Sequence, residues 1–231
     1  MNPGTAALVR GLDVLTALAE PAAARDGLGV SRLAAIVGVD KSQMSRTLQA
    51  LDERGFVARD PDTLAYRLGW QVHALAALAG DAALIDAARP VLAGLVAELG
   101  ESAHLSVRQG DQVLTLLSES PPAAIHAPAR VGGLTPLATT SAGRVLAIGL
   151  DDAELLRLGV YPAPVRCAEA DGFAIVREEF EPGLVAVAAP VRDQAGRVIA
   201  AVNVSAPQFR FGDRLDAAAP VVVAAARALG G

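Results

Sequence analysis

The chain has 231 residues, of which 52% are apolar and only 3% aromatic, and a formal net charge of −5. This length leaves room for two domains with a substantial core built from Ala, Val and Leu. The single cysteine excludes an intramolecular disulfide and a cysteine zinc site, and because we find neither a signal peptide nor an apolar run long enough to cross a bilayer, we expect a soluble, cytoplasmic protein without a membrane partner.

The N-terminal segment, residues 5–20, predicts one helix. Apolar residues recur at helical spacing from Ala7 to Leu18, and Pro21 ends the helix. Residues 22–30 are rich in Ala and Gly, and we expect a loop there.

Residues 30–56 carry the most informative pattern in the chain. Apolar residues recur at three- and four-residue steps on both sides of Gly38, which predicts two amphipathic helices joined by a sharp corner. Gly38 can adopt the positive φ that such a corner needs, and Asp40 or Ser42 can cap the second helix. An ordinary helical hairpin gives the same pattern, but here the outer face carries donors with the reach to contact bases and phosphates in a major groove. The candidate DNA-binding residues of the two helices are Ser31, Lys41, Ser42, Gln43, Ser45, Arg46 and Gln49.

A predicted hairpin follows directly. Two short extended pieces flank a Pro61-Asp62 turn, which is typical of the wing of a winged helix. Arg59 and Arg67 are candidate contacts to the DNA backbone, although the arginines of a plain hairpin would simply be solvated. The order helix, helix-turn-helix, hairpin is more specific than any one of its parts.

The charge distribution bears on the oligomeric state. Residues 1–80 hold eight basic and eight acidic side chains, and residues 81–231 hold twelve and seventeen, so the net acidity lies in the second part. A neutral DNA-binding half has little sequence-independent attraction to phosphates. We therefore expect two copies of the chain at each binding site.

The segment 68–79 predicts a linker helix, because an aliphatic stripe recurs at helical spacing from Leu68 to Leu78. We expect this helix to lead into a second domain and to pack against a second protomer. A helix packed on its own domain gives the same pattern. His73 has no expected partner within one helical turn, and we interpret it as structural.

The remainder of the chain predicts an α+β domain. Residues 82–99 are helical but contain Pro90, which breaks a helix interior, so we expect a short helix to Arg89 and a longer one that ends at Gly100. Helices around a mostly antiparallel sheet make a sensor-like domain. The expected strands are 103–108, 112–118, 124–131, 184–191 and 197–205, the expected helices are 140–150, 152–158 and 213–229, and residues 159–172 are expected to be irregular.

Short motifs are spread over nearly the whole chain. They are Gly55-Phe56-Val57, Tyr66-Arg67-Leu68-Gly69, Thr135-Pro136-Leu137-Ala138-Thr139-Thr140-Ser141-Ala142-Gly143-Arg144, Gly172-Phe173-Ala174, Pro182-Gly183-Leu184, Val187-Ala188-Ala189-Pro190-Val191 and residues 196–205. In this order and spacing, they make the sequence resemble the IclR-type family of bacterial transcription regulators.

The resemblance implies three parts: a winged helix-turn-helix DNA-binding domain at 1–68, a linker helix at 69–80, and a C-terminal α/β, GAF-like effector-binding and oligomerisation domain at 81–231. It implies a ligand-responsive transcription regulator, which we expect to be a repressor. Its expected partners are double-stranded operator DNA, a small-molecule effector and further copies of itself, as a dimer or a dimer of dimers. No cofactor or metal is expected.

The resemblance also implies an effector pocket between the sheet and a helix that begins near Ser141. Backbone N–H groups at that helix start would bind a carboxylate, and leucine side chains would form apolar walls. Asn203 and Ser205, two apart on one strand, would hydrogen-bond the ligand. Without the resemblance, we would place these two on a solvent-exposed strand face. The candidate effector-binding residues are Leu137, Ser141, Ala142, Gly143, Val176, Leu184, Ala186, Asn203 and Ser205.

Two departures from the family pattern bear on the effector. Ala186 stands where a small polar residue, commonly cysteine, is usual, and Val176 and Arg177 stand where some members have an acidic side chain. A pocket without those polar groups is more apolar. We therefore expect a larger carboxylate, aromatic in character, rather than glyoxylate or pyruvate.

Catalysis is not expected. His104 and His126 lie on predicted strands and could meet Ser106 or Ser141, but the sequence contains no Gly-x-Ser-x-Gly elbow and no His-Glu-x-x-His motif. We interpret the acidic turn at 178–181 as solvated. The alternatives that remain are a partner-binding helix-turn-helix module and a small-molecule-binding protein without operator specificity.

Overall fold

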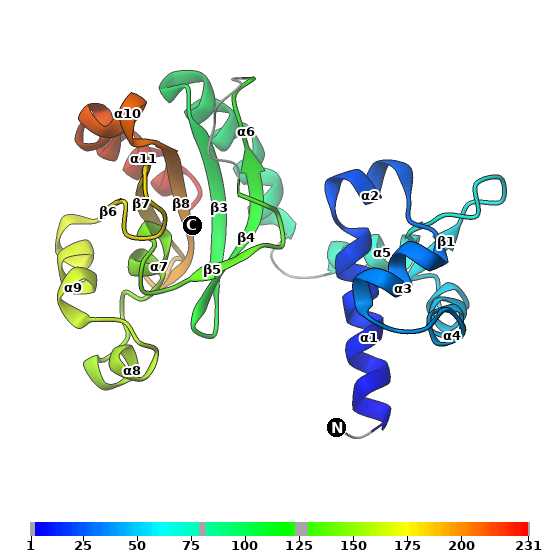
Figure 1. Cartoon of the computed structure of the whole chain (residues 1–231). Coiled ribbons are helices and arrows are strands. Elements are labelled where there is room, and N and C mark those ends of the chain that lie inside the picture. The colour runs from blue at the N-terminus through cyan, green and yellow to red at the C-terminus, as the bar shows by residue number, and fades with distance from the viewer. Residues whose placement is uncertain (1–2, 79–81, 123–128, 231) are drawn as a thin grey trace. The chain divides into compact units, whose positions relative to one another are not determined.

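The computed structural model describes residues 3–78, 82–122 and 129–230. They form two compact units, Met1–Ala82 and Ala83–Gly231 (Figure 1). The first unit is helical with a two-stranded hairpin, and the second contains a six-stranded antiparallel sheet with helices on both faces. The predicted fold class, a helix-turn-helix domain followed by a domain with an antiparallel sheet, is confirmed.

The first unit packs three helices and the hairpin around one apolar core. Leu18, Leu33, Leu48 and Val57 come from four different elements and are fully buried or nearly so. Burial of this shared core stabilises helices that are too short to persist alone. The elements are α1 (Pro3–Leu18), α2 (Pro21–Asp26), α3 (Val30–Val37), α4 (Lys41–Asp52), β1 (Val57–Arg59), β2 (Tyr66–Leu68) and α5 (Trp70–Leu78).

The corner between α3 and α4 has the predicted geometry. Gly38 ends α3 in the left-handed region, with φ at 75°. Asp40, rather than Ser42, caps α4: its Oδ1 accepts the Gln43 N–H at 2.8 Å and the Ser42 hydroxyl at 2.7 Å. These hydrogen bonds, the one from Gln43 foremost, hold the pKa of Asp40 below its usual 3.8. The predicted helix-turn-helix is therefore confirmed.

The expected loop at 22–30 is wrong in its first half, where α2 forms. Three consecutive alanines follow Pro21, and alanine has the highest helix propensity while proline is tolerated in a first turn. Gly27 ends the helix at a φ of 74°, and an added Cβ there would lie 2.9 Å from the Ala65 side chain. The wing behind α2 therefore requires glycine at this position.

The wing and α5 complete the first unit. β1 and β2 pair antiparallel, and the Asp60 carboxylate organises the turn by accepting the N–H groups of Asp62 and Thr63. Helix α5 has no buried residue, and Trp70 is 84% exposed. His73 does have a neighbour within one turn, contrary to expectation, because its ring lies 5.4 Å from that of Trp70.

The second unit is built on a sheet with the strand order β5-β4-β3-β8-β7-β6, all neighbours antiparallel. Strands far apart in sequence therefore lie side by side, as β3 and β8 do. The strands are β3 (Ser102–Gln109), β4 (Gln112–Glu119), β5 (Leu134–Pro136), β6 (Ala174–Arg177), β7 (Leu184–Arg192) and β8 (Val198–Pro207). The helices are α6 (Ala82–Leu99), α7 (Ser141–Leu146), α8 (Asp152–Arg157), α9 (Pro162–Asp171), α10 (Gln208–Phe211) and α11 (Leu215–Ala228), with a 3₁₀ turn at Gly212–Arg214.

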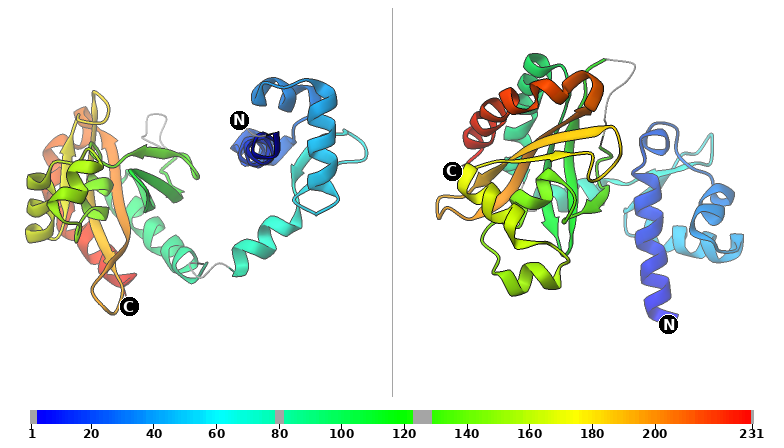
Figure 2. Two further views of the ribbon diagram at one scale, coloured as in Figure 1. Left: turned by 90° about the horizontal axis from the view of Figure 1, so that it is seen from below. Right: turned by 60° about the vertical axis from the view of Figure 1, so that its left-hand side comes forward.

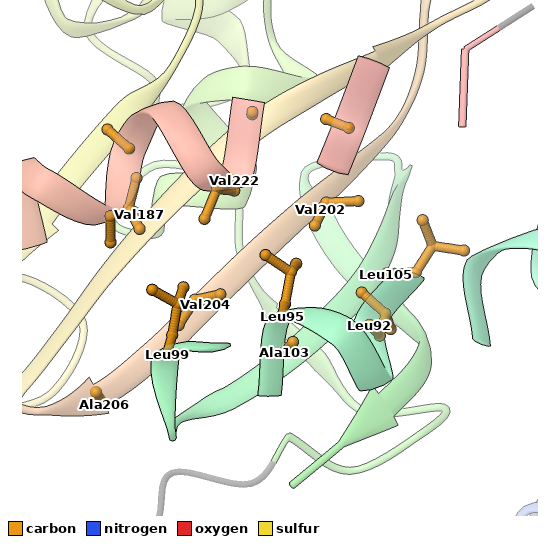
Figure 3. Close-up of a cluster of buried hydrophobic side chains, with 14 of the residues drawn as sticks. Leu92, Leu95, Leu99, Ala103, Leu105, Val187, Val202, Val204, Ala206 and Val222 are labelled. Atoms are coloured by element: carbon orange, nitrogen blue, oxygen red, sulfur yellow. The ribbon is translucent and has the colours of Figure 1, made fainter. Parts of the chain in front are cut away.

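The sheet buries a different layer on each face (Figure 2). Side chains of α6 and α11 pack with Val187, Val202 and Val204 on one face, as Figure 3 shows. Helices α7, α8 and α9 pack on the other face against residues such as Ala188 and Ala201. This division follows from the alternation of side chains along each strand, and it leaves the start of α7 close to the middle of the sheet.

Three expectations for this unit are wrong, each because of a proline or a glycine. Helix α6 runs unbroken through Pro90, since Ala88 and Leu92 are fully buried on either side and their burial offsets the lost hydrogen bond. Residues 162–171 form α9 rather than irregular chain, because its prolines lie in the first turn.

The third error concerns residues 129–131 of the strand expected at 124–131, because these three residues are not a strand. Residues 124–128 lie outside the described residues. The edge strand β5 starts later because Gly132 and Gly133 form the turn that exchanges backbone hydrogen bonds with Thr115. The C-terminal helix also begins two residues later than expected, at Leu215.

Candidate functional site

The two faces of α4 differ in polarity. Met44 and Leu48 are fully buried in the core of the first unit, whereas Lys41, Ser45 and Arg46 are exposed. This separation follows from the 3.6-residue period of the helix. The outer face therefore offers ammonium, hydroxyl and guanidinium donors, the groups that bind base edges and phosphates.

Hydrogen bonds within the first unit already engage the side chains of two of the predicted DNA-binding residues. Ser42 donates to the Asp40 cap, and Gln49 Nε2 donates to Glu53 Oε1 at 2.9 Å. Gln49 would have to exchange this partner to reach a base. The predicted residues that are exposed are Ser31, Lys41, Ser42, Ser45, Arg46, Gln49, Arg59 and Arg67, whereas Gln43 is half-buried.

The wing presents its two arginines from neighbouring strands, since Arg59 pairs with Tyr66 and Arg67 follows it. The Arg59 guanidinium lies 5.7 Å from the centre of the Tyr66 ring, a cation–π contact that orients it. Arg32, next to Ser31 on α3, is also exposed and was not among the predicted residues. Its only signal in the sequence is a basic residue in the first turn of that helix.

A cavity of about 730 Å³ lies in the second unit between the sheet and the start of α7. Strands β3, β4, β6, β7 and β8 contribute to its walls, as do the segment of β5 and the loop between β6 and β7. Its size is in the range of small-molecule sites. The predicted effector-binding residues that line it are Ser141, Ala142, Val176, Leu184, Ala186, Asn203 and Ser205.

Two predicted residues, Leu137 and Gly143, do not line the cavity. Leu137 is fully buried in the core beneath α7 and forms no wall of the site. A Cβ added to Gly143 would lie 2.0 Å from the Leu137 carbonyl oxygen, so glycine is needed for this close approach. The Gly143 N–H is not free for a ligand either, because it donates to the Thr140 hydroxyl that caps α7, at 3.1 Å.

The cavity has a polar floor on the sheet. Asn203 is half-buried and Ser205 only 8% exposed, so the alternative of a solvent-exposed face is wrong. His104, which is 2% exposed, lies beside them on β3, opposite Asn203 in the register. Its Nε2 is 2.9 Å from Ser205 Oγ, and its Nδ1 is 3.0 Å from Ser118 Oγ on β4.

His104, Ser106 and Thr115 line the cavity but were not predicted as site residues. A signal was available, because Ser102, His104 and Ser106 alternate with the apolar residues Ala103, Leu105 and Val107 along the strand. Such an alternation on a strand buried on both faces points to a polar site beneath the covering helix.

Ion pairing marks the edge of the cavity. Arg144 on α7 pairs with Glu179 and donates to the Ile175 carbonyl at 3.2 Å, so it joins α7 to β6 and the loop that follows. Residues 178–181 are all exposed, as expected of a solvated turn, and Glu179 has this ion pair in addition. The charged side chains lining the cavity are Arg130 and Glu181, both exposed.

The histidine–serine contacts differ from those considered for a hydrolase. His104 meets Ser118 and Ser205, not Ser106 or Ser141, and a hydroxyl occupies the Nδ1 side where a Ser-His-Asp triad has a carboxylate. His126 lies outside the described residues. Within the described parts of the chain, no group of three metal-ligating side chains is placed to hold an ion, and no helix is long and apolar enough to cross a membrane.

Two family models match the sequence. The IclR helix-turn-helix domain matches residues 7–61, and the bacterial transcriptional regulator IclR C-terminal domain matches residues 76–158 and 165–230. Among curated relatives, the HTH-type transcriptional regulator BhcR of Paracoccus denitrificans is 31% identical, over 98% of this chain and 86% of that protein. The Pca regulon regulatory protein of Pseudomonas putida is 29% identical, over 86% of this chain and 73% of that protein.

Solved structures show the same fold. HmgR of Pseudomonas aeruginosa is 31% identical, with a TM-score of 0.58 over 95% of this chain and 94% of that one. An IclR homologue of Microbacterium hydrocarbonoxydans was solved in complex with 4-hydroxybenzoate. It has a TM-score of 0.79 over 96% of this chain and 97% of that one. At 21% identity, this second likeness shows the fold alone.

Proposed function

Because the chain belongs to the IclR family of bacterial transcriptional regulators, we propose that it is a repressor released or recruited by an organic carboxylate that binds in the cavity of the second unit. The family assignment itself makes the chain a ligand-responsive, DNA-binding transcription regulator. Relatives named as repressors, such as YiaJ of Escherichia coli, support repression rather than activation. Catalysis forms no part of the proposal.

DNA binding is assigned to the outer face of α4 and to the wing. In this proposal, Lys41, Ser45 and Arg46 enter the major groove, and the wing arginines contact the backbone. The exposure of these side chains, opposite the buried Met44 and Leu48, supports the assignment. Each domain would contribute few phosphate contacts, so a pair of domains is needed for tight binding.

The second copy is proposed to pack on α5. This helix has no buried residue, and its apolar side chains include Trp70 and Leu78, each 84% exposed. Large exposed apolar side chains on one short helix indicate an interaction surface. A dimer, or a dimer of dimers, is therefore the proposed assembly, with the linker at about 69–80 between the domains at 1–68 and 81–231.

The effector is proposed to be an aromatic carboxylate. The single observation that carries this part is the division of the cavity into an apolar wall, with Val176, Leu184 and Ala186, and a polar floor on β3 and β8. A ring would pack against the wall while its polar substituents meet the floor. The Microbacterium homologue that holds 4-hydroxybenzoate supports a ligand of this class. The proposed polar contacts are the backbone N–H groups of Ser141 and Ala142 and the side chains of Asn203 and Ser205.

Two measurements test the proposal. Fluorescence anisotropy with duplex DNA from the region upstream of the protein's own gene should show saturable binding that a scrambled duplex does not compete. Calorimetry should then show binding of 4-hydroxybenzoate or benzoate, and the bound acid should change DNA affinity, since an effector acts only through its preference for one state. Indifference to the duplex, or tight binding of pyruvate without response to the aromatic acids, would contradict the proposal.

A further inference from the structure

His104 lies at the centre of the polar floor, where three strands meet. β4 presents Ser118 to its Nδ1 at 3.0 Å, and β8 presents Ser205 to its Nε2 at 2.9 Å. The Asn203 side chain comes from the position opposite His104 in the register. Its ring is therefore held in place by hydroxyl groups on both sides and borders the cavity.

The two hydroxyl contacts are compatible with either protonation state of the imidazole without movement of heavy atoms. A hydroxyl both donates and accepts, so Ser118 and Ser205 can face a neutral ring, with one donor and one acceptor nitrogen. They can equally face an imidazolium, in which both nitrogens donate. A carboxylate at the Nδ1 position would instead favour the charged form permanently.

The charged side chains described around the cavity do not provide a buried positive group for a bound anion. Of the described residues that line the cavity, Arg130 and Glu181 are charged, have opposite signs, and are exposed. On α7, Ser141 faces the cavity, while Arg144 is paired with Glu179. Glu101, just before β3, is held by Arg210. Burying an organic anion costs free energy unless a positive group or several donors compensate it.

We propose that His104 takes up a proton when an organic anion occupies the cavity, and that this proton strengthens binding of the anion. This inference rests on the proposed function. A nearby negative charge favours the imidazolium, and so raises the pKa of His104 in the complex above its value in the free protein. Affinity for the anion is then highest below the free-state pKa and falls as pH rises toward the pKa of the complex.

The experiment is calorimetric titration of the full chain with 4-hydroxybenzoate and with benzoate, between about pH 6 and pH 8. Repeating each titration in two buffers of different ionisation enthalpy counts the protons taken up. For the wild type, we expect uptake of up to one proton per protomer and a Kd that rises by up to about tenfold per pH unit. His104→Gln keeps a hydrogen-bonding side chain without a titratable ring, and should show a Kd that varies less than about twofold across the same range.

Two matched histidine variants sharpen the test. His73→Gln, on α5 and outside the cavity, should retain the wild-type proton uptake on effector binding, whatever its effect on the proposed dimer surface. His126→Gln tests whether the remaining histidine takes up the proton instead. The inference would be overturned if His126→Gln lost proton uptake while His104→Gln retained it. Should His104→Gln fail to fold, ¹⁵N shifts of the wild-type ring decide, because two protonated nitrogens are expected only in the complex.

The outcomes separate the inference from the proposed function. Binding by the wild type without proton uptake would overturn the role of His104 and leave the effector class intact. Failure of the wild type to bind either acid would overturn the proposed effector class and the role of His104 together.

Discussion

The two units of this chain present polar side chains in opposite ways. On α4, Arg46 projects from a surface whose apolar side, with Leu48, is buried in the core. On β3, His104 and Ser106 are themselves buried, between the sheet and the layer that covers it. In the first unit, the proposed binding surface and the stabilising core are separate faces of one helix, whereas in the second the proposed site is part of the core.

Substitutions in the two units should therefore have different consequences. A change on the outer face of α4 should alter binding with little effect on stability, while a change around the cavity should couple the two. An outer-face residue of α4 whose substitution destabilises the fold, or a cavity residue whose substitution does not, would contradict this expectation.

The largest effect is expected from Leu48→Ala. This side chain is fully buried in the core of the first unit, and its truncation should lower the free energy of unfolding by about 2–5 kcal/mol. Urea denaturation followed by circular dichroism measures the loss. A change below about 1 kcal/mol would show that α4 is not anchored through this face.

Gly143→Ala should destabilise the second unit by about 1–3 kcal/mol or more, because the new methyl group would overlap the Leu137 carbonyl. Gly94→Ala, on α6 with nothing within 4 Å of the added Cβ, is the matched control. It should be neutral or slightly stabilising. Differential scanning calorimetry measures the melting temperatures of both variants. Equal melting temperatures would contradict the close approach of Gly143 to the Leu137 carbonyl.

Arg46→Ala should weaken operator binding by roughly 1–3 kcal/mol, or about fivefold to 150-fold, while leaving the unfolding midpoint unchanged. The exposed Arg25→Ala on α2, which removes a charge paired with Asp26, controls for lost charge. Anisotropy titrations with the same duplex compare the two variants. Equal losses would mean that only overall charge matters.

Ala186→Ser restores a polar group to the apolar wall of the cavity, and should shift preference from benzoate toward pyruvate by a few-fold, on the order of 1 kcal/mol. The side chain is half-buried and lines the cavity, so the added hydroxyl has room to bind. Calorimetry with both acids gives the ratio of affinities. An unchanged ratio would remove Ala186 from the proposed site.

The smallest effect is expected from Asp40→Asn at low pH. The pKa of Asp40 is lowered by hydrogen bonds to Gln43 and Ser42, so its charged form contributes stability above the unfolded pKa of 3.8 that is lost as pH falls through the folded pKa. The asparagine variant should lack this part of the acid dependence. Unfolding midpoints measured on both sides of pH 4 test it.

Sequence reasoning succeeded where local chemistry decides the structure. Gly38 and Asp40 mark the corner between α3 and α4 because one needs a left-handed backbone and the other an acceptor for free N–H groups. It failed at Pro90, where a local rule predicts a break but burial of Ala88 and Leu92 maintains the helix. It also failed at residues 159–172, where two prolines favour irregular chain but both lie in the first turn of α9.

The sequence alone was enough for the helix-turn-helix, the hairpin that follows it and the family, because periodicity, capping and motif spacing depend on residues close together in the chain. Only the tertiary structure decided which polar groups share a cavity. His104 and Ser205 are 101 positions apart, and their contact exists because β3 pairs with β8 rather than with a sequence neighbour on that side. Strand pairing over such a separation is set by burial of the whole sheet, which no local pattern encodes.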